Sequence, residues 1–336
     1  MTLLLTTDLG LESLLAEEVR ELLDPEARFE LLPGRVVTDE GQPVGAHWRD
    51  LRLTHELGRV IGDVEVGSLD DLRAVARGLD LDWLRQSSSF RVTASGETSA
   101  GFSRREAAGA VGAVLQEGHG TAVDLTNPEA TVRLDLIADR ALLWSPFRGM
   151  LSDRIRRGRN LRSALRPTVA AAMVRMLGLV GRREPALFLD PTCGSGTIVV
   201  EAGEVAPGLE LHASDWDAAT VDVARATFAA HELEVSCATR DARHLPDEWN
   251  GRVDFVVTNP PFGIRLARRT LSLRRLYAEL LESVARVLKP GGRVALLSPR
   301  RKAVAEAASE LPLELVAERE VTLGQLRPVI HVFRRD

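Results

Sequence analysis

The chain has 336 residues, of which 45% are hydrophobic and 27% are charged. These values are typical of a globular protein, and the length suits two domains that each bury a core. No segment approaches the roughly eighteen uninterrupted apolar residues of a membrane span, and Met1–Leu5 lacks the basic start of a secretory signal. Two cysteines, without CxxC or HxxxH spacing, exclude a disulfide framework and the common metal motifs. We therefore expect a metal-free protein of the cytoplasm with no membrane partner.

Charge is distributed unevenly along the chain, whose net charge is −5. Residues 1–150 carry 15 arginines against 25 acidic residues, a net −10, whereas residues 151–336 carry 28 basic against 23 acidic residues, a net +5. Between Arg148 and Arg183 there are ten arginines and one acidic residue, Asp153. Such a run attracts phosphate, so we expect contact with RNA; a solvated face of a linker is the simpler alternative.

The first half of the chain alternates helix and strand signals. Leucines at helical spacing predict an amphipathic helix over residues 11–22, and Ser68 and Ser103 stand where N-caps of two further helices are expected. Those helices are Leu69–Ala76 and Arg104–Gln116. The predicted strands are Leu3–Thr7, Gly34–Thr38, Gly58–Val66 and Phe90–Ala94, with a hairpin of Thr131–Ile137 and Ala141–Phe147 turning at Asp139-Arg140. This mixture predicts α+β units rather than a doubly wound sheet.

The second half has a different pattern. The Pro-, Gly- and Arg-containing segment Ser145–Asn160 is typical of a linker, and a helix is predicted from Leu161 to about Gly178. Strands then alternate with helical segments, which predicts βαβ units and a mainly parallel sheet. These strands are Ala186–Leu189, Leu209–Ser214, Val235–Ala238, Val253–Thr258 and Arg293–Ser298; Leu313–Thr322 and Val329–Arg334 predict an antiparallel edge.

A glycine-containing segment follows the first of these strands. Asp190 ends the strand, and Gly194 and Gly196 precede a helix that starts near Thr197. Two glycines one residue apart let the backbone turn sharply and approach a ligand closely. Val199 stands where a dinucleotide fingerprint has its third glycine, which argues against a dinucleotide but does not by itself identify the cofactor. A glycine turn that binds nothing is the simpler alternative.

Acidic residues end the next two strands. Asp215 lies 21 residues after Gly194, where a carboxylate can accept hydrogen bonds from ribose hydroxyls. The adjacent Trp216 can pack on an adenine face, and Asp241 can accept a hydrogen bond from an adenine amino group. The sequence thus predicts an adenosine-containing ligand at the carboxyl ends of these strands.

The tetrapeptide Asn259-Pro260-Pro261-Phe262 follows the strand Val253–Thr258, at the end where ligands bind in such sheets. An exocyclic amine of a base is a weak nucleophile because its lone pair delocalises into the ring. The side-chain oxygen of Asn259 and the carbonyl of Pro260 can each accept one N–H, and Phe262 offers a ring for stacking. The segment predicts methyl transfer to such an amine; a strand-ending turn with a core phenylalanine is the simpler alternative.

With both motifs, residues 165–336 resemble a class I, S-adenosylmethionine-dependent amino-methyltransferase. Leu161–Thr168 resembles the segment that leads into the catalytic domain of THUMP-containing RNA methyltransferases. Leu9–Glu18 and Val123–Pro128 resemble the N-terminal opening and the last THUMP hairpin of that family. The resemblance covers nearly the whole chain.

The resemblance implies an α/β fold. It implies a C-terminal Rossmann-like class I methyltransferase, with a mainly parallel sheet and an antiparallel edge strand, preceded by an α+β ferredoxin-like and THUMP region. The implied segments are a ferredoxin-like region (1–55), a THUMP domain (56–147), an arginine-rich linker (148–164) and the methyltransferase domain (165–336). The net −10 of residues 1–150 departs from the basic surface expected of an RNA-binding module.

The resemblance also implies a function: transfer of methyl from S-adenosyl-L-methionine to N2 of a guanosine of tRNA, at position 6 of the acceptor stem, by a monomer without an obligate protein partner. The family's THUMP domain implies docking of the tRNA 3′ end. The implied catalytic residues are Asn259, Pro260 and Phe262. The implied cofactor contacts are Asp190, Thr192, Gly194, Ser195, Gly196, Thr197, Asp215, Trp216, Asp241, Ala242 and Asn259. The implied RNA contacts are Arg104, Arg105, Arg154, Arg156, Arg157, Arg159, Arg162, Arg274 and Arg275.

Several alternatives stay open at this stage. Methylation of guanosine 10 of tRNA, of a 23S rRNA guanine, or of adenine N6 in DNA requires the same amine-binding motif. Protein glutamine methylation poses the same chemical problem, although that motif typically ends in tyrosine. An RNA-binding protein with a catalytically silent methyltransferase fold is the non-enzymatic alternative. The sequence does not decide between mono- and dimethylation.

Overall fold

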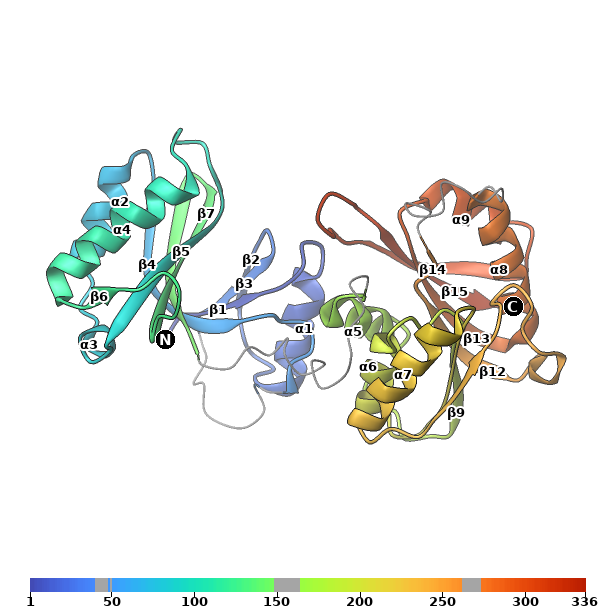
Figure 1. Cartoon of the computed structure of the whole chain (residues 1–336). Helices are drawn as coiled ribbons and strands as arrows, with labels where there is room; N and C mark the ends of the chain where they lie inside the picture. Colours follow the sequence, from blue (N-terminus) through green and yellow to red (C-terminus); the bar gives the residue numbers. More distant parts are fainter. Residues whose placement is uncertain (40–47, 49, 148–163, 262–272) are drawn as a thin grey trace. The chain divides into compact units, whose positions relative to one another are not determined.

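The computed structural model describes residues 1–39, 48, 50–147, 164–261 and 273–336, which fall into two compact units. The first unit comprises residues 1–7 and 15–151, and the second comprises residues 8–14 and 152–336. Within the described residues, each unit is built around one sheet, of eight strands in the first and seven in the second (Figure 1). The mixture of helices and strands in each unit agrees with the alternating helical and strand patterns of the sequence.

The first sheet has the strand order β2-β3-β1-β4-β8-β7-β5-β6. Its strands are β1 (Leu3–Thr6), β2 (Phe29–Leu32), β3 (Arg35–Thr38), β4 (Leu57–Glu65), β5 (Ser89–Thr98), β6 (Ala122–Val123), β7 (Ala130–Ala138) and β8 (Arg140–Pro146). The N-terminal strand β1 pairs antiparallel with both β3 and β4, so the first strands and the later ones share a single sheet. The helices of this half are α1 (Glu12–Leu22), α2 (Leu69–Arg77), α3 (Asp82–Arg85) and α4 (Arg104–His119).

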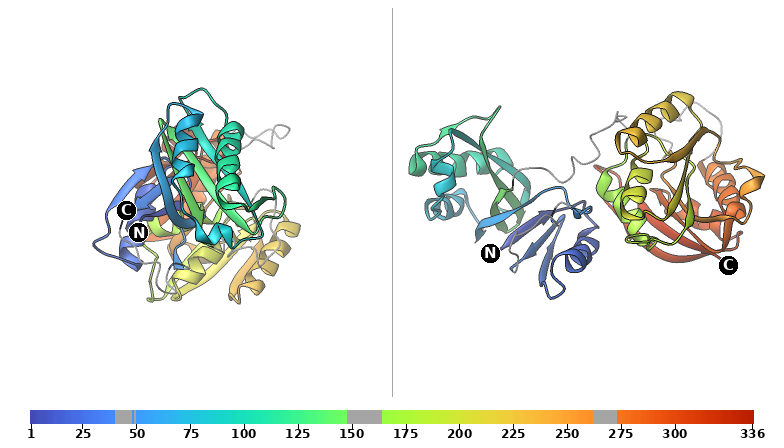
Figure 2. Two further views of the ribbon diagram at one scale, coloured as in Figure 1. Left: turned by 90° about the vertical axis from the view of Figure 1, so that its left-hand side faces the viewer. Right: turned by 90° about the horizontal axis from the view of Figure 1, so that it is seen from below.

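Helices α2 and α4 lie side by side over one face of this sheet (Figure 2). Their buried stripes meet strand residues such as Phe90 and Leu134 in one hydrophobic core, with Val111 at the centre of α4 fully buried. The predicted N-cap of α4 is confirmed: Ser103 Oγ accepts a hydrogen bond from Glu106 N at 3.3 Å, while the Glu106 carboxylate accepts one from Ser103 N at 2.8 Å. This reciprocal capping box fixes where α4 begins.

A buried carboxylate connects strands across the first sheet. Asp135 on β7 is 3% exposed, and its Oδ2 lies 2.7 Å from Arg35 Nε of β3. Ser95 Oγ donates to Asp135 Oδ1 at 2.5 Å, and Trp144 Nε1 donates to Oδ2 at 3.1 Å. Both carboxylate oxygens are therefore satisfied, which a buried charge requires.

Two details of the first unit differ from the sequence predictions. The hairpin between β7 and β8 turns at Ala138-Asp139 rather than at Asp139-Arg140, because Arg140 pairs with Ile137. Ala138 adopts φ 55°, which suits the tight turn of a hairpin. Strands β2 and β6 and helix α3 were not predicted, because elements of two to four residues are too short for a clear periodicity.

The second sheet has the strand order β11-β10-β9-β12-β13-β15-β14. Its strands are β9 (Ala186–Asp190), β10 (Leu209–Asp215), β11 (Val235–Thr239), β12 (Val253–Thr258), β13 (Leu288–Ser298), β14 (Leu313–Glu320) and β15 (Val329–Arg335). The pairs from β11 to β13 are parallel, and β15 runs antiparallel to both β13 and β14. The helices are α5 (Pro167–Met176), α6 (Thr197–Val205), α7 (Ala218–Ala230), α8 (Leu273–Val287) and α9 (Arg301–Ala308), with a 3-10 turn η3 (Asp247–Trp249).

Helices cover both faces of this sheet. Figure 1 shows α5, α6 and α7 on one side and α8 and α9 on the other. Val256 and Leu296 of the central strands pack with Leu280 and Val284 of α8. Because successive strand residues point to opposite faces, Leu297, the residue after Leu296 in β13, faces the other side of the sheet, where α5 packs against β13.

Helix α5 begins later than the sequence suggested. The prediction placed its start at Leu161, but residues 164–166 are not helical and α5 starts at Pro167. Proline is favoured at the first helical position and pushes the preceding residue into extended backbone, as Arg166 shows with ψ 135°. Leu161 itself lies outside the described residues.

The strand order reverses between β9 and β12. The chain runs outward from β9 through β10 to β11, and then returns to the other side of β9 with β12. At such a switch point the loops after the two central strands diverge, and ligands bind in the crevice outside their carboxyl ends. The predicted loop after β9 and the first three residues of the tetrapeptide after β12, residues 259–261, both lie there.

Candidate active site

Asp190, the last residue of β9, is completely buried. Its Oδ1 accepts a hydrogen bond from Thr192 N at 3.1 Å, whereas its Oδ2 has no hydrogen-bond partner among the described residues. Burial raises the pKa of Asp190 well above its ordinary value, and the nearby carboxylate of Asp215 acts in the same direction. A buried acceptor without a donor is costly in a folded protein and marks a place where a ligand can supply one.

The glycines of the loop after β9 adopt left-handed backbone, as their predicted role requires. Gly194 has φ 55° and Gly196, the N-cap of α6, has φ 88°. A Cβ at Gly196 would lie 2.4 Å from Phe228 Cε1, so only glycine fits there. The next residue, Thr197, opens α6; its hydroxyl lies 3.4 Å from that of Ser195, and both residues are buried.

Asp215, the last residue of β10, faces the same loop. Its Oδ2 accepts a hydrogen bond from Gly194 N at 3.0 Å, and its Oδ1 accepts one from Asp217 N at 3.2 Å. Burial raises the pKa of Asp215. The adjacent Trp216 is 71% exposed, which is unusual for so large an apolar ring and leaves its face accessible.

The tetrapeptide begins directly after β12, whose last residue contacts the loop after β9. Thr258 Oγ1 lies 2.7 Å from Thr192 Oγ1, which joins the two strand ends. Asn259 Oδ1 is buried and has no hydrogen-bond partner among the described residues, and Pro260 is buried beside it. Phe262 lies outside the described residues. Among the described residues, the switch point thus holds two acceptors without a hydrogen-bond partner, Asp190 Oδ2 and Asn259 Oδ1.

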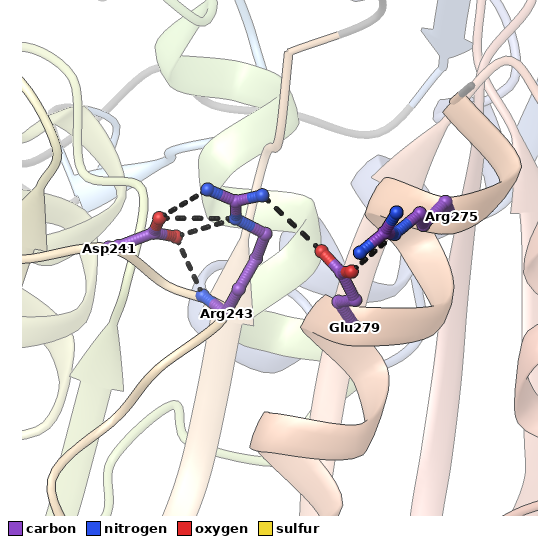
Figure 3. Close-up of polar contacts among 4 residues, drawn as sticks. All are labelled: Asp241, Arg243, Arg275 and Glu279. Atoms are coloured by element: carbon purple, nitrogen blue, oxygen red, sulfur yellow. Dashed lines mark hydrogen bonds and ion pairs between the residues drawn. The ribbon is translucent and has the colours of Figure 1, made fainter. Parts of the chain in front are cut away.

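Asp241 and Ala242 follow β11, and Arg243 engages the carboxylate (Figure 3). Arg243 Nη2 lies 2.5 Å from Asp241 Oδ2, and Arg243 Nη1 lies 3.3 Å from Glu279 Oε2 on α8. Arg275 Nε lies 2.6 Å from the other oxygen of Glu279. The hydrogen bonds of Arg243 lower the pKa of Asp241. Sequence reasoning missed Arg243; a cation two residues after an acid in the same loop was the available signal.

The predicted RNA-contacting arginines have different surroundings. Arg104 and Arg105 are exposed in the first turn of α4, where the helix dipole disfavours cations. Arg274 pairs with Glu306 at 2.6 Å and Arg275 with Glu279. The five linker arginines lie outside the described residues: Arg154, Arg156, Arg157, Arg159 and Arg162.

Among the described residues, no group of three His, Cys, Asp or Glu side chains could hold a metal ion. Nor is any described helix both long enough and apolar enough to cross a bilayer.

The strand order, the glycine turn after β9 and the Asn-Pro-Pro segment after β12 together define a class I methyltransferase whose site suits an amine. A family model described as the RMKL-like methyltransferase domain matches residues 154–328, and a THUMP domain model matches residues 66–145. The chain belongs to this family of THUMP-containing methyltransferases.

Individual relatives agree with this assignment. A tRNA (guanine(6)-N2)-methyltransferase of Thermus thermophilus is 35% identical over 336 residues, covering 98% of each chain. A tRNA (guanine(10)-N2)-dimethyltransferase of Methanothermobacter thermautotrophicus is 28% identical and covers 74% of this chain and 73% of its own. The crystal structure of TrmN from Thermus thermophilus superposes with a TM-score of 0.84 at 33% identity, covering 100% of this chain and 99% of that one. The predicted fold class, the methyltransferase activity and the S-adenosylmethionine cofactor are thereby confirmed.

Proposed function

We propose that the protein transfers a methyl group from S-adenosylmethionine to N2 of guanosine 6 in the acceptor stem of tRNA. The observation that carries the proposal is Asn259 Oδ1, a buried amide oxygen without a partner among the described residues, at the switch point of a methyltransferase sheet. The choice of guanosine 6 is supported by the 35% identical relative, which is named for that activity.

The chain's own residues supply orientation and charge stabilisation. Bound S-adenosylmethionine would supply an electrophilic methyl group and leave as S-adenosylhomocysteine, and the proton lost from the methylated amine would pass to water. Asn259 Oδ1 and the Pro260 carbonyl each accept one N–H of the guanine amine, which aims the nitrogen and stabilises the positive charge that develops on it. Phe262 stacks on the base drawn out of its helix. The contact between Thr192 and Thr258 keeps these acceptors next to the loop after β9.

We assign the cofactor to the carboxyl ends of β9, β10 and β11. Asp215 accepts from the ribose hydroxyls, Trp216 covers the adenine, and Asp241 accepts from the adenine amino group. The buried Asp190 Oδ2 takes a donor from the ligand or a water held with it. The remaining proposed contacts are Thr192, Gly194, Ser195, Gly196, Thr197, Ala242 and Asn259.

We assign tRNA binding to the first unit and the linker. The proposed segments are residues 1–55, the THUMP domain 56–147, the linker 148–164 and the methyltransferase domain 165–336. Arg104 and Arg105 contact the RNA backbone, which would explain two arginines in a helix turn that disfavours cations. The linker arginines and Arg274 and Arg275 add phosphate contacts. We further propose that the chain acts as a monomer in the cytoplasm.

The proposal is tested with unmodified tRNA and S-adenosylmethionine that carries a labelled methyl group. We expect one N2-methylguanosine per tRNA, mapped to position 6 by mass spectrometry of fragments. Label at guanosine 10, or transfer to a 23S rRNA fragment or to duplex DNA in preference to tRNA, would contradict the assigned substrate.

Asn259→Ala tests the assigned mechanism. The loss of one preorganised acceptor should lower kcat by about 100- to 1,000-fold. Cofactor affinity measured by calorimetry should fall by about tenfold at most, because Asn259 is only one of the proposed cofactor contacts. Asn250→Ala is the matched control. Asn250 Oδ1 already accepts a hydrogen bond from Arg286 Nη1 at a distance of 2.5 Å, and Asn250 is not part of the switch point. Turnover of Asn259→Ala at the control's rate would refute the role of Asn259.

A further inference from the structure

Arg243 holds the carboxylate of Asp241 with an unusual number of donors from one residue. The backbone N of Arg243 donates to Asp241 Oδ1 at 3.0 Å, Nε lies 3.0 and 3.1 Å from the two oxygens, and Nη2 lies 2.5 Å from Oδ2. These three donors make four contacts, two on each oxygen, so the carboxylate is held in a single orientation.

The same arginine reaches a second element. Its Nη1 lies 3.3 Å from Glu279 Oε2, near the middle of α8, and Arg275 one turn earlier holds Glu279 Oε1. Figure 3 shows Arg243 between the two carboxylates, with Arg275 on the far side of Glu279. The charges alternate along this row, so removing Arg243 leaves the carboxylates of Asp241 and Glu279 without a cation between them.

Stability alone gives little reason for this arrangement. Asp241 is 38% exposed and Arg275 68% exposed, and pairs at such positions contribute roughly 0–1 kcal/mol. The geometry is instead well suited to orientation, because a guanidinium that engages both oxygens prevents the carboxylate from rotating.

We propose that Arg243 is a positioning residue, which holds the carboxylate of Asp241 in the orientation that receives the cofactor's adenine amino group and which is itself held by Glu279 of α8. This inference rests on the proposed function, in which Asp241 recognises adenine. It extends that function by assigning the discrimination of adenine to a three-residue unit formed by Asp241, Arg243 and Glu279.

The test compares two ligands by calorimetry on the full chain: S-adenosylhomocysteine and its inosine counterpart, in which an oxo group replaces the adenine amine. The wild-type protein should bind the adenosine compound about 100-fold more tightly, because the inosine oxygen faces a carboxylate. In Arg243→Gln this ratio should fall about tenfold. In Arg334→Ala, the matched control, which removes a part-exposed arginine from its ion pair with Glu314 between β15 and β14, the ratio should stay within about twofold of wild type.

Glu279→Gln reports on the second contact. It should lower the ratio of the two affinities by about threefold, because Arg243 still contacts Asp241 but loses its ion pair with Glu279 on α8. Turnover separates this role from catalysis: Arg243→Gln should raise KM for S-adenosylmethionine about tenfold with kcat within about threefold, whereas Asn259→Ala should chiefly lower kcat. Should Arg243→Gln fail to fold, Arg243→Lys, which keeps the charge but not the two-pronged contact, should show the reduced ratio.

An unchanged ratio in a folded Arg243 variant would overturn the inference. That failure is distinct from failure of the proposed function, which would appear as a wild-type protein that binds neither compound. A wild-type protein that binds both equally would remove Asp241 as the adenine acceptor, and with it the role given to Arg243.

Discussion

Gly196→Ala should destabilise the second unit far more than the same change two residues earlier. Both Gly194 and Gly196 have left-handed backbone, with φ of 55° and 88°. They differ in surroundings: a Cβ at Gly196 would lie 2.4 Å from Phe228 Cε1 and 2.8 Å from Cζ, whereas one at Gly194 would have no atom within 4 Å. Phe228 is 3% exposed, so its ring has little room to move.

The two contributions can be separated. Left-handed backbone costs an alanine about 1–2 kcal/mol, and this applies to both positions. Overpacking a buried ring costs a further 1–3 kcal/mol or so, which applies only at Gly196. We therefore expect a loss of about 2–5 kcal/mol in the free energy of unfolding for Gly196→Ala, against about 1–2 kcal/mol for Gly194→Ala.

Urea unfolding of the full chain, followed by circular dichroism, measures the loss in the free energy of unfolding for each glycine variant. A double-mutant cycle with Phe228→Leu tests whether the loss for Gly196→Ala comes from the Phe228 ring. If the ring is the obstacle, Gly196→Ala should cost about 1–3 kcal/mol less in the Phe228→Leu background. Equal losses for the two glycine variants, or a cycle without coupling, would refute the steric explanation. Gly196→Ala should also weaken cofactor binding, because the loop must shift to accommodate the methyl group.

Two further predictions concern charge. Asp215→Asn should raise the Kd for S-adenosylhomocysteine by about 10- to 100-fold, since hydrogen bonds to a charged acceptor contribute about 1.5–3 kcal/mol; an unchanged Kd in calorimetry at pH 7 would exclude Asp215 from the ribose site. His331, whose side chain is 1% exposed and whose Nδ1 lies 2.7 Å from Glu318 Oε1, has its pKa lowered chiefly by burial. As the pH falls, the imidazole of His331 is therefore protonated first in the unfolded chain, near the ordinary histidine pKa of about 6.5. The stability present at higher pH is lost as the pH falls from this value through the lower pKa of the folded protein. Urea unfolding between pH 5 and 8 should show a decline of at most about 1.4 kcal/mol per pH unit from this residue, and a His331→Gln protein with the same slope would contradict the assignment.

The sequence predicts local features of this fold well where a residue type has one physical use. Ser103 with Glu106 three residues later fixes the start of α4, and the apolar runs of β9 and β12 end where the motifs place them. The start of α5 was not predicted, because the apolar periodicity begins upstream of Pro167, which is the first helical residue. A helix start that is set by a capping residue was predictable, whereas one at which the apolar periodicity and a proline disagree was not.

Likewise, some residues of the candidate site could be predicted from the sequence and others could not. Asp190, Asp215 and Asn259 could be found because each ends a strand or directly follows one, and the topology brings strand ends together. Arg243 and Glu279 could not, because their contact depends on how α8 packs against the loop after β11, which no local pattern encodes. The geometry of the Phe262 ring and of the linker arginines stays a prediction, since these residues lie outside the described part of the chain.

The carboxylate of Asp135 limits how the first unit can be divided. Its cation, Arg35, comes from the first 55 residues, while Ser95 and Trp144 come from the THUMP segment. A fragment cut at residue 56 would keep the buried acid and lose its arginine, at a cost of several kcal/mol. The N-terminal strands are therefore structurally inseparable from the module they precede. Any chimaera that transplants this THUMP domain onto another catalytic domain should carry residues 1–55 with it.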